Sequence, residues 1–329
     1  MGASPTGDNN PVRKTCWKLV SALPSGYPKQ YMPNSLAIIG AGRVGRALGR
    51  RLREAGWRIG AIVTRSEASA RRAVRFIGAG KPFAGMTWQI LPSQVILITT
   101  PDDQIDVAAR DLARIGEEEL HGRVVLHTSG AMDSGALEPL RAQGATVGSM
   151  HPLQSFCGVT VPSLEGRVFA IEGEAQAVRV ARQIARELGG SPVRVAGGKK
   201  LLYHAAAAMA AGHILAVEEA ATQLLVSLGM KRREAVRALL PLTRQVLDNF
   251  ETLGPRAAWT GPLSRGDFNV VRAHLQALRD SPQEFMLAYE ALSRLAACVL
   301  TQEPAGTLAE LGKSSVKPIA KAKVTGGNA

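Results

Sequence analysis

The sequence predicts an α/β fold in which an N-terminal, mostly parallel sheet is followed by an all-α C-terminal domain. From Ser35 onward, short apolar runs typical of strands alternate with stretches of helical periodicity. Strands that alternate regularly with helices are typical of a parallel sheet covered on both faces. After Gly198 the strand-like runs end, and only helical patterns follow. These observations divide the chain into a sheet domain and a helical domain.

The elements of the sheet domain are expected in a regular order with short connections. Strands are expected where short runs of mainly aliphatic residues occur, at 36–40, 57–63, 95–99, 123–127, 145–149, 168–171 and 192–196. Helices are expected where apolar residues recur every three or four positions, at 43–55, 66–75, 103–115, 134–142 and 174–188.

The helical domain begins with an alanine-rich segment, for which we expect one continuous helix over 199–228. Further helices are expected near 231–250, 267–279 and 283–300. Because alanine lets a second helix approach closely, we expect the long helix to lie buried at the centre of this domain and at a homodimer interface. Polar residues within it, including Tyr203 and His204, argue against a membrane span.

The chain is therefore expected to have four regions: a flexible tail over 1–34, the sheet domain over 35–198, a helical substrate and dimerisation domain over 199–302, and a flexible tail over 303–329. Both tails are rich in Pro, Gly, Ser and Lys and lack sustained periodicity. The three cysteines are far apart and have no metal-binding spacing, which indicates a reduced, cytoplasmic protein without a metal site. The N-terminus lacks the layout of a secretory signal.

Composition and charge narrow the class of protein. With 46% apolar and 20% charged residues, the chain is expected to fold rather than to remain disordered. Its net charge of +13 is spread widely, with the densest cluster at Arg50, Arg51 and Arg53. Such a surface suits small anions as well as polyanions, and it is equally typical of a merely basic protein. Since aromatic residues make up only 5% and no recognition motif is present, we expect a small anionic substrate rather than nucleic acid.

A glycine-rich segment follows the first expected strand directly and opens the first expected helix. Its residues, Gly40, Ala41, Gly42, Arg43, Val44 and Gly45, match the pattern G-x-G-x-x-G. The first glycine permits the tight turn, the second lets backbone amides approach a pyrophosphate, and the third lets helix and strand pack. In this context the motif predicts a dinucleotide site, although a tight strand-to-helix turn without nucleotide remains an alternative.

The end of the second strand indicates which dinucleotide binds. A site for NAD offers an acidic residue there, about 20 residues beyond the motif, to bind the ribose hydroxyls. Here Arg65 and Ser66 stand at that point. A guanidinium and a hydroxyl suit a 2′-phosphate, so NADP is expected. Arg43 either assists or is a solvated residue at the start of a helix.

The next strand ends carry polar residues at the edge where ligands of parallel sheets bind. Thr100, Pro101 and Asp102 follow one strand and are expected to line the cofactor crevice. Ser129 follows the next strand, in which His127 is interpreted as a core residue. His151 ends the strand after that and is the better functional candidate of the two histidines, although a structural role is also open.

The helical domain supplies further candidates. Lys200 and His204 lie four residues apart and hence on one helix face. A buried lysine has a lowered pKa suited to proton transfer, whereas a lysine at a helix start with its head in solvent is the alternative. Arg265 is a candidate clamp for a substrate carboxylate, and Asp267 is either its partner or a helix cap.

Six segments together resemble a family of predicted NADP-dependent oxidoreductases that join a Rossmann-like domain to a helical domain of unknown function numbered 2520. The segments are Gly40 to Gly45, Thr100-Pro101-Asp102-Asp103, 127–131, 151–156, Tyr203-His204-Ala205-Ala206 and Thr260-Gly261-Pro262 with Arg265-Gly266-Asp267. The resemblance covers about residues 35–300. Ala211-Gly212 departs from it, since Ser-Asn is expected there. In the wider 6-phosphogluconate dehydrogenase-like superfamily, a lysine followed four residues later by asparagine performs acid-base chemistry; here His204 replaces the asparagine.

The residues and the resemblance together imply an NADPH-dependent oxidoreductase that reduces a small carbonyl or imine compound, with a carboxylate-bearing keto acid as the expected substrate. Lys200 would supply the proton or stabilise charge on the developing alkoxide, His204 or His151 would orient it, and Ser129 would hold the anionic group of the substrate. The alternative is a non-catalytic NADP-binding sensor or scaffold, which substrate-dependent NADPH oxidation would distinguish.

Overall fold

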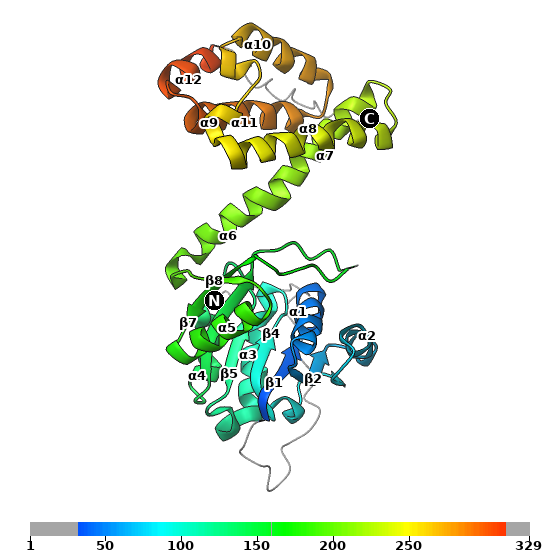
Figure 1. The fold of residues 1–329 in the computed structure, drawn as a ribbon, viewed down its shortest axis with the longest axis vertical. Helices are drawn as coiled ribbons and strands as arrows, with labels where there is room; N and C mark the ends of the chain where they lie inside the picture. Colours follow the sequence, from blue (N-terminus) through cyan, green and yellow to red (C-terminus); the bar gives the residue numbers. More distant parts are fainter. Residues whose placement is uncertain (1–31, 159, 314–329) are drawn as a thin grey trace, which may run out of the picture. The chain divides into compact units, whose positions relative to one another are not determined.

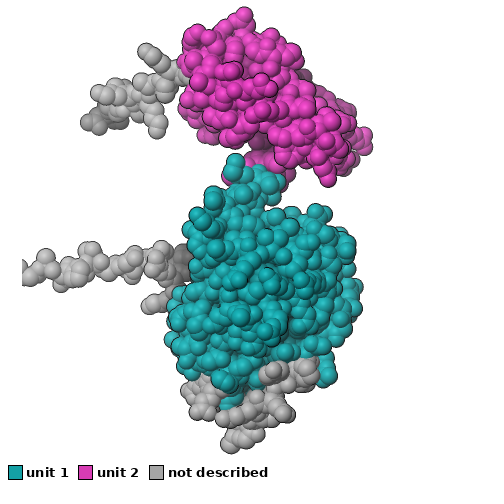
Figure 2. Space-filling view, turned by 60° about the vertical axis from the view of Figure 1, so that its left-hand side comes forward, with its two compact units in different colours: residues 1–211 teal, residues 212–329 magenta. Residues whose placement is uncertain are grey.

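A single mixed sheet forms the centre of the first of two units, residues 1–211 and 212–329 (Figure 2). The computed structural model describes residues 32–158 and 160–313. The strands are β1 (Met32–Ile39), β2 (Arg58–Thr64), β3 (Lys81–Ala84), β4 (Ser93–Ile98), β5 (Val124–His127), β6 (Thr146–Pro152), β7 (Val168–Gly173) and β8 (Ser191–Arg194). The eight lie in the order β3-β2-β1-β4-β5-β6-β7-β8 (Figure 1). Neighbours are parallel except β6 and β7, which run antiparallel, so the predicted mostly parallel sheet is confirmed.

Strand β3 was not predicted from the sequence. It has four residues, among them Lys81 and Pro82, and therefore lacks an aliphatic run. Proline cannot donate to the ladder and is tolerated at a sheet edge, where β3 lies. Its pairing with β2 depends on tertiary contacts rather than on local preference.

Helices cover both faces of the sheet, as expected. The helices of this unit are α1 (Arg43–Glu54), α2 (Glu67–Ile77), α3 (Ile105–Gly116), α4 (Glu138–Arg141), α5 (Ala175–Glu187) and α6 (Lys200–Ala208). Helices α1, α2 and α5 pack on one face, in a core that includes Leu48, Ile77 and Ile184. Helices α3 and α4 pack on the other, with Leu112 and Leu140 in its core. Short 3₁₀ turns complete the unit at Trp88–Ile90, Asp102–Gln104, Glu117–Leu120, Ser134–Leu137 and Gly197–Lys199.

The described part of the second unit is helical. Its helices are α7 (Ile214–Ser227), α8 (Arg232–Leu253), α9 (Pro255–Ala258), α10 (Phe268–Ala277), α11 (Gln283–Leu300) and α12 (Pro304–Gly312). Leu311 of α12 is buried against Val271 of α10 and Ala297 of α11. The expected flexible tail over 303–329 is therefore wrong for 304–312, where apolar side chains give the segment a packing partner. Residues 1–31 and 314–329 of the expected tails lie outside the described residues, while β1 already begins at Met32.

The long alanine-rich segment differs from its prediction in two ways. A π-helical turn at Met209–His213 separates α6 from α7, and the division between the two units falls at residues 211 and 212 rather than at 198. The expected burial is wrong within each unit: Leu201 of the first unit and Leu215 of the second are 73% and 70% exposed. Over the described residues, Gly197–Ser227 is the one helical run that is long and apolar enough to cross a membrane, judged by length and composition alone.

Candidate active site

The glycine-rich turn between β1 and α1 has the geometry that a dinucleotide site needs. Gly40 has a φ of +84°, a left-handed conformation that side chains disfavour. A Cβ on Gly40 would also lie 2.5 Å from the Thr100 methyl group, and one on Gly45 would overlap the Thr99 hydroxyl. At Gly42 the nearest atom to such a Cβ is the Gly40 carbonyl at 3.8 Å. Gly40 and Gly45 are thus packed tightly against Thr100 and Thr99, whereas there is room for another group at Gly42.

The end of β4 lies directly against this turn. Thr99 donates from its hydroxyl to the Gly40 carbonyl at 2.8 Å. Thr100 has a buried hydroxyl without a hydrogen-bond partner in the described structure. A buried polar atom normally has a partner, so this hydroxyl is suited to a bound ligand. Together with the open backbone at Gly42, it shows that the residues present fit a dinucleotide.

Arg65 and Ser66 follow β2, as the sequence indicates. The Arg65 side chain is exposed. The Ser66 hydroxyl caps α2, because it accepts from the Ser69 amide at 3.4 Å and donates to the Ser69 hydroxyl at 3.0 Å. Arg72 also donates to the Ser69 hydroxyl, at 2.8 Å. Ser66 therefore has a structural role in this state, while Arg65 is free to reach a phosphate.

Arg43 and Val44 begin α1 beside the turn. Arg43 is exposed, and its aliphatic stem lies against Gly158, where a Cβ would approach its Cγ to 3.0 Å. Val44 packs against the core beneath the sheet edge. Both interpretations of Arg43, phosphate contact and solvated helix start, are compatible with this position.

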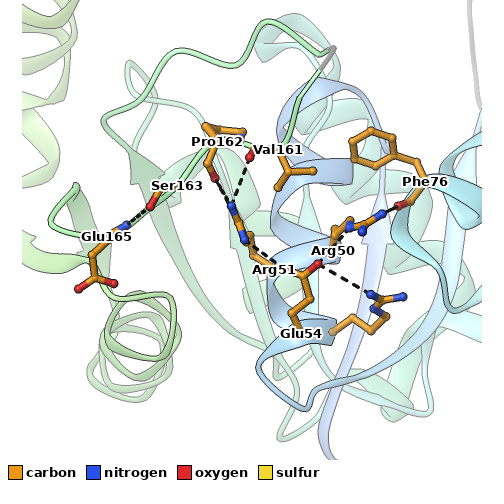
Figure 3. A network of polar contacts seen from close by, with 9 residues as sticks. Arg50, Arg51, Glu54, Phe76, Val161, Pro162, Ser163 and Glu165 are labelled. Atoms are coloured by element: carbon orange, nitrogen blue, oxygen red, sulfur yellow. Dashed lines mark hydrogen bonds and ion pairs between the residues drawn. The ribbon is translucent and has the colours of Figure 1, made fainter.

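The densest arginine cluster has partners within the chain (Figure 3). Arg50 donates to the Phe76 carbonyl at 3.1 Å and to Glu54 at 3.0 Å. Arg51 donates to the carbonyls of Val161 and Pro162 at 3.2 and 3.1 Å, tying that loop to α1 (Figure 3). These guanidinium groups stabilise the first unit, so their charge is not concentrated into an anion site.

Lys200 is buried at the same end of the sheet. The residue is only 1% exposed, and its Nζ donates to the Ser129 carbonyl at 2.8 Å and to the Ser149 hydroxyl at 2.7 Å. Burial lowers the pKa of Lys200 to about 8, against the opposing effect of Glu172, Asp133 and Asp102. The alternative of a solvated lysine at a helix start is therefore wrong for Lys200, and it describes the exposed Lys199 instead.

Asp102 connects the cofactor edge with this lysine. The Ser129 hydroxyl donates to Asp102 Oδ2 at 2.9 Å and accepts from the amides of Ala131 and Met132. This hydroxyl is thus occupied by Asp102 and by the loop after β5, and the expected contact with an anionic group of the substrate would have to replace one of these bonds. Ser129 positions Asp102 through its hydroxyl and Lys200 through its carbonyl.

Two histidines and a tyrosine gather over Gly130. His151 Nδ1 lies 2.9 Å from the Tyr203 hydroxyl, and the His151 and His204 rings meet edge to face with centroids 5.7 Å apart. A Cβ on Gly130 would lie 2.5 Å from His204 Nδ1 and 2.9 Å from His151 Nε2, so both nitrogens converge on this glycine. Burial lowers the pKa of His151 to about 4 and raises that of Tyr203 to about 12. Both side chains are neutral at pH 7, and the buried His204 Nδ1 has no partner in the described structure.

His127 is a structural residue, as the sequence indicated. It is fully buried on β5, and its Nδ1 accepts from the Ser129 amide at 3.2 Å. Its Nε2 therefore carries the proton and donates to the Asp133 carbonyl at 2.9 Å. Burial, followed by the charge of Lys200, lowers the pKa of His127 to about 4.

The structure brings together some of the predicted site residues and separates others. Lys200, His204, His151, Ser129 and Asp102 form one cluster within the first unit. Pro101 lies between Thr100 and Asp102 at this edge. Arg265 and Asp267 lie in the second unit, where they pair with each other at 3.1 Å on the surface, and Arg265 borders a cavity of about 670 Å³. Asp267 stands at the start of α10 but makes no side-chain cap.

Sequence reasoning missed three polar residues of the cluster. Ser149 contacts Lys200 directly, and Glu172 binds Ser149 and Ser134. Ser149 lies two residues before His151 in the same strand, a signal that could have identified it. Glu172 gave no such signal, since its place depends on the antiparallel pairing of β6 and β7. In the described ranges, no group of three or more His, Cys, Asp or Glu residues could hold a metal ion.

Family models match most of the described chain. Residues 28–152 match a Rossmann-like domain, and residues 167–296 match a domain of unknown function, DUF2520. The chain therefore combines a Rossmann-like domain with a DUF2520 domain, which confirms the resemblance stated from the sequence. Curated protein sequences include no match to it.

Solved structures share the fold. A proposed NADP oxidoreductase from Bacteroides fragilis is 22% identical, with a TM-score of 0.66 over 81% of this chain and 98% of its own. A reductive aminase from Aspergillus terreus in complex with NADPH and ethyl-5-oxohexanoate is 17% identical, with a TM-score of 0.59 over 80% and 93%. An imine reductase from Pseudomonas sp. is 18% identical, with a TM-score of 0.58 over 85% and 98%. At these identities the likeness establishes the fold.

The buried, neutral His127 predicts that the protein loses stability in acid. Its pKa is about 4 when folded and 6.5 when the side chain is solvated, so the unfolded chain binds more protons between these values. The free energy of unfolding should fall by roughly 3 kcal/mol from this residue as the pH drops from 7 to 4. Urea titrations at each pH would measure it.

The exposed His121 offers a matched control for this effect. His127→Asn should lose that share of the pH dependence, although it is less stable overall, while His121→Asn should keep the wild-type slope. Equal slopes for both variants would show that His127 does not titrate in the window.

Proposed function

We propose that the protein is an NADPH-dependent oxidoreductase that reduces a small carbonyl or imine compound. The observation that carries this proposal is the buried amine of Lys200 at the same sheet edge as the glycine-rich turn. Gly40 of the turn lies against Thr100, and Asp102, two residues further along, accepts from Ser129, whose carbonyl binds Lys200. The names of solved structures with this fold, an imine reductase and a reductive aminase bound to NADPH, support the same class.

The cofactor is held by the turn and the ends of β2 and β4. The backbone amides of Arg43 and Val44, in the first turn of α1, would bind the pyrophosphate, whereas the Gly42 amide donates to the Gly40 carbonyl at 2.6 Å. Arg65 binds the 2′-phosphate, which selects NADP over NAD. Thr100 and Asp102 border the nicotinamide end. When bound, the reduced nicotinamide supplies the hydride.

Lys200 supplies the proton that reduction of a carbonyl or imine requires. An ammonium has three donors, and Ser129 and Ser149 account for two of them in the described structure, so one remains for a substrate atom. A pKa of about 8 leaves most of the amine protonated at pH 7 and makes its proton easier to give than that of a solvated lysine. Turnover in the direction of reduction should accordingly fall as the pH rises through 8.

The two imidazoles orient the substrate. His151 is neutral and is fixed by Tyr203, and the unpartnered His204 Nδ1 points to the same place above Gly130. A substrate hydroxyl, amine or carboxyl group could pair with these nitrogens. Arg265 and Asp267 lie in the second unit, where they pair with each other at 3.1 Å, and a role for them in binding a substrate carboxylate stays a prediction from the sequence. Oxidation of NADPH in the presence of keto acids, and of ketones with and without amines, tests the reaction class.

Arg65→Ala should separate the two nicotinamide cofactors. Removing the guanidinium should weaken NADPH binding by about 1 to 3 kcal/mol and leave NADH nearly unchanged, the usual range for hydrogen bonds to charged groups. Titration calorimetry would measure both. Arg75→Ala, an exposed arginine at the other end of α2, is the control and should change neither. Equal losses for both cofactors would contradict the assignment of Arg65.

Lys200→Met tests the proton donor while preserving the length and burial of the side chain. Turnover should fall by roughly 10²- to 10⁴-fold, the range for loss of a general acid, while NADPH affinity is retained. Steady-state kinetics with calorimetry would measure both. Lys199→Met, at the exposed neighbouring lysine, should have little effect. If the two variants behaved alike, Lys200 would not be the proton donor.

We also propose that the protein is a homodimer through its helical domain. The exposed apolar side chains of the long segment, among them Leu202 and Leu215, require a cover, and the small alanines between them allow a helix of a second copy to approach. Light scattering should give twice the mass of one chain, and Leu215→Asp should reduce it to one. Arg182→Asp, a charge change on exposed α5, should stay dimeric. A monomeric wild type would refute the proposal.

A further inference from the structure

Glu172 is a carboxylate at the candidate active site that the proposed reaction has not yet used. It lies near the end of β7 and is held by three donors. The Ser134 amide and the Ser134 hydroxyl each donate to it at 2.7 Å, and the Ser149 hydroxyl lies 3.4 Å from Oε2. A carboxylate bound by a backbone amide and two hydroxyls keeps one orientation.

The antiparallel step in the sheet fixes Glu172 relative to Ser149. The two residues are directly opposite each other in the register of β6 and β7. Side chains of opposed residues point to the same face, so the carboxylate and the hydroxyl are placed by two backbones rather than by flexible side chains. The distance between them is therefore a property of the sheet.

The hydrogen bonds have a defined direction. A lysine ammonium can only donate, so the Ser149 hydroxyl must accept from Lys200 Nζ, at 2.7 Å. The proton of that hydroxyl is then free to be donated to Glu172. The result is a chain from Lys200 through Ser149 to Glu172, anchored at its far end by Ser134.

Several charged or titratable groups surround Lys200, and they differ in effect. Glu172, Asp133 and Asp102 favour its charged form, with Glu172 contributing most. His127 and His151 face it from β5 and β6, and His204 lies on its own helix. Both strand histidines have pKa values lowered to about 4, so they add no positive charge at pH 7. Burial lowers the pKa of Lys200, and Glu172 is the group that opposes this effect most.

We infer that Glu172 is a positioning residue which, through Ser149, keeps Lys200 charged and directed at the substrate. The role of Lys200 as proton donor rests on the proposed function, whereas the Glu172–Ser149–Lys200 chain does not. Without Glu172, a buried lysine in contact with only a carbonyl and a hydroxyl would become neutral at lower pH. The amine of Lys200 would then lose its proton at a lower pH and could not donate it to the substrate above that pH.

Glu172→Gln tests this inference in the full-length protein, because it removes the charge and keeps the size of the side chain. The first measurement is the titration of Lys200 by NMR of ¹⁵N-labelled lysine amines, with Lys200→Met identifying the signal. The pKa should fall below its wild-type value, and each unit of fall should reduce kcat/KM at pH 9 about tenfold while leaving it unchanged at pH 6. NADPH affinity should not change.

Glu174→Gln is the matched control. Glu174 lies two residues further along and binds Arg141 and the Val147 amide instead of Ser149. This variant should leave both the Lys200 titration and the pH profile as in the wild type. A fall in the Lys200 pKa in Glu174→Gln as large as in Glu172→Gln would overturn the inference, because it would make the effect one of general charge.

Ser149→Ala decides the question if Glu172→Gln does not fold. It keeps the contacts of Glu172 with Ser134 but removes the hydroxyl that both Lys200 and Glu172 contact, so it too should lower the pKa of Lys200. An unchanged Lys200 titration in every folded variant would overturn the inference. If the variants lower the pKa of Lys200 but the wild-type protein turns over no carbonyl or imine, the positioning role is supported and the proposed function is refuted.

Discussion

The burial of one ammonium group is the constraint on which the candidate active site depends. Lys200 is held among the ends of β5, β6 and β7, where water cannot solvate its charge. A buried charge is tolerated only when acceptors surround it, and the structure provides the Ser129 carbonyl, the Ser149 hydroxyl and the nearby Glu172. Ser129 in turn holds Asp102 and the amides of the following turn. The cofactor edge, the loop after β5 and the first turns of α6 are thereby joined through a single side chain.

Much of this arrangement could be predicted from the sequence, because its signals are local. The glycine pattern follows a strand and begins a helix, and the conformation of Gly40 follows from that order. Thr100, Ser129 and His151 could be placed at one edge because the carboxyl ends of parallel strands meet there. Lys200 stood out because a charged residue beside an alanine-rich run is costly to bury without partners. His127 was recognised as structural because it lies inside a strand.

The remainder depends on contacts between segments that are distant in the sequence. The reversal of direction between β6 and β7 has no local signal, so the pairing of Ser149 with Glu172 could not be anticipated. Strand β3 has the composition of a loop and forms only because β2 offers a free edge. The polar composition of 303–313 suggested a tail, but two well-spaced leucines give α12 a buried side. For the alanine-rich segment 199–228 burial was expected, but several of its leucines are exposed. Apolar composition alone does not determine whether a helix is covered by its own chain.

The close packing of His151 and His204 against Gly130 has a consequence for which residues of this site can be substituted. The rings of His151 and His204 lie so close to Gly130 that a Cβ there would come within 2.9 Å of a nitrogen of each, so their positions depend on the absence of a side chain at 130. Any larger residue at 130 would push the rings apart and disturb both Tyr203 and the loop that holds Lys200. On the proposed function, other substrate shapes would be reached by replacing the two rings, while Gly130 is kept. A library of variants should therefore keep glycine at position 130 and vary positions 151 and 204.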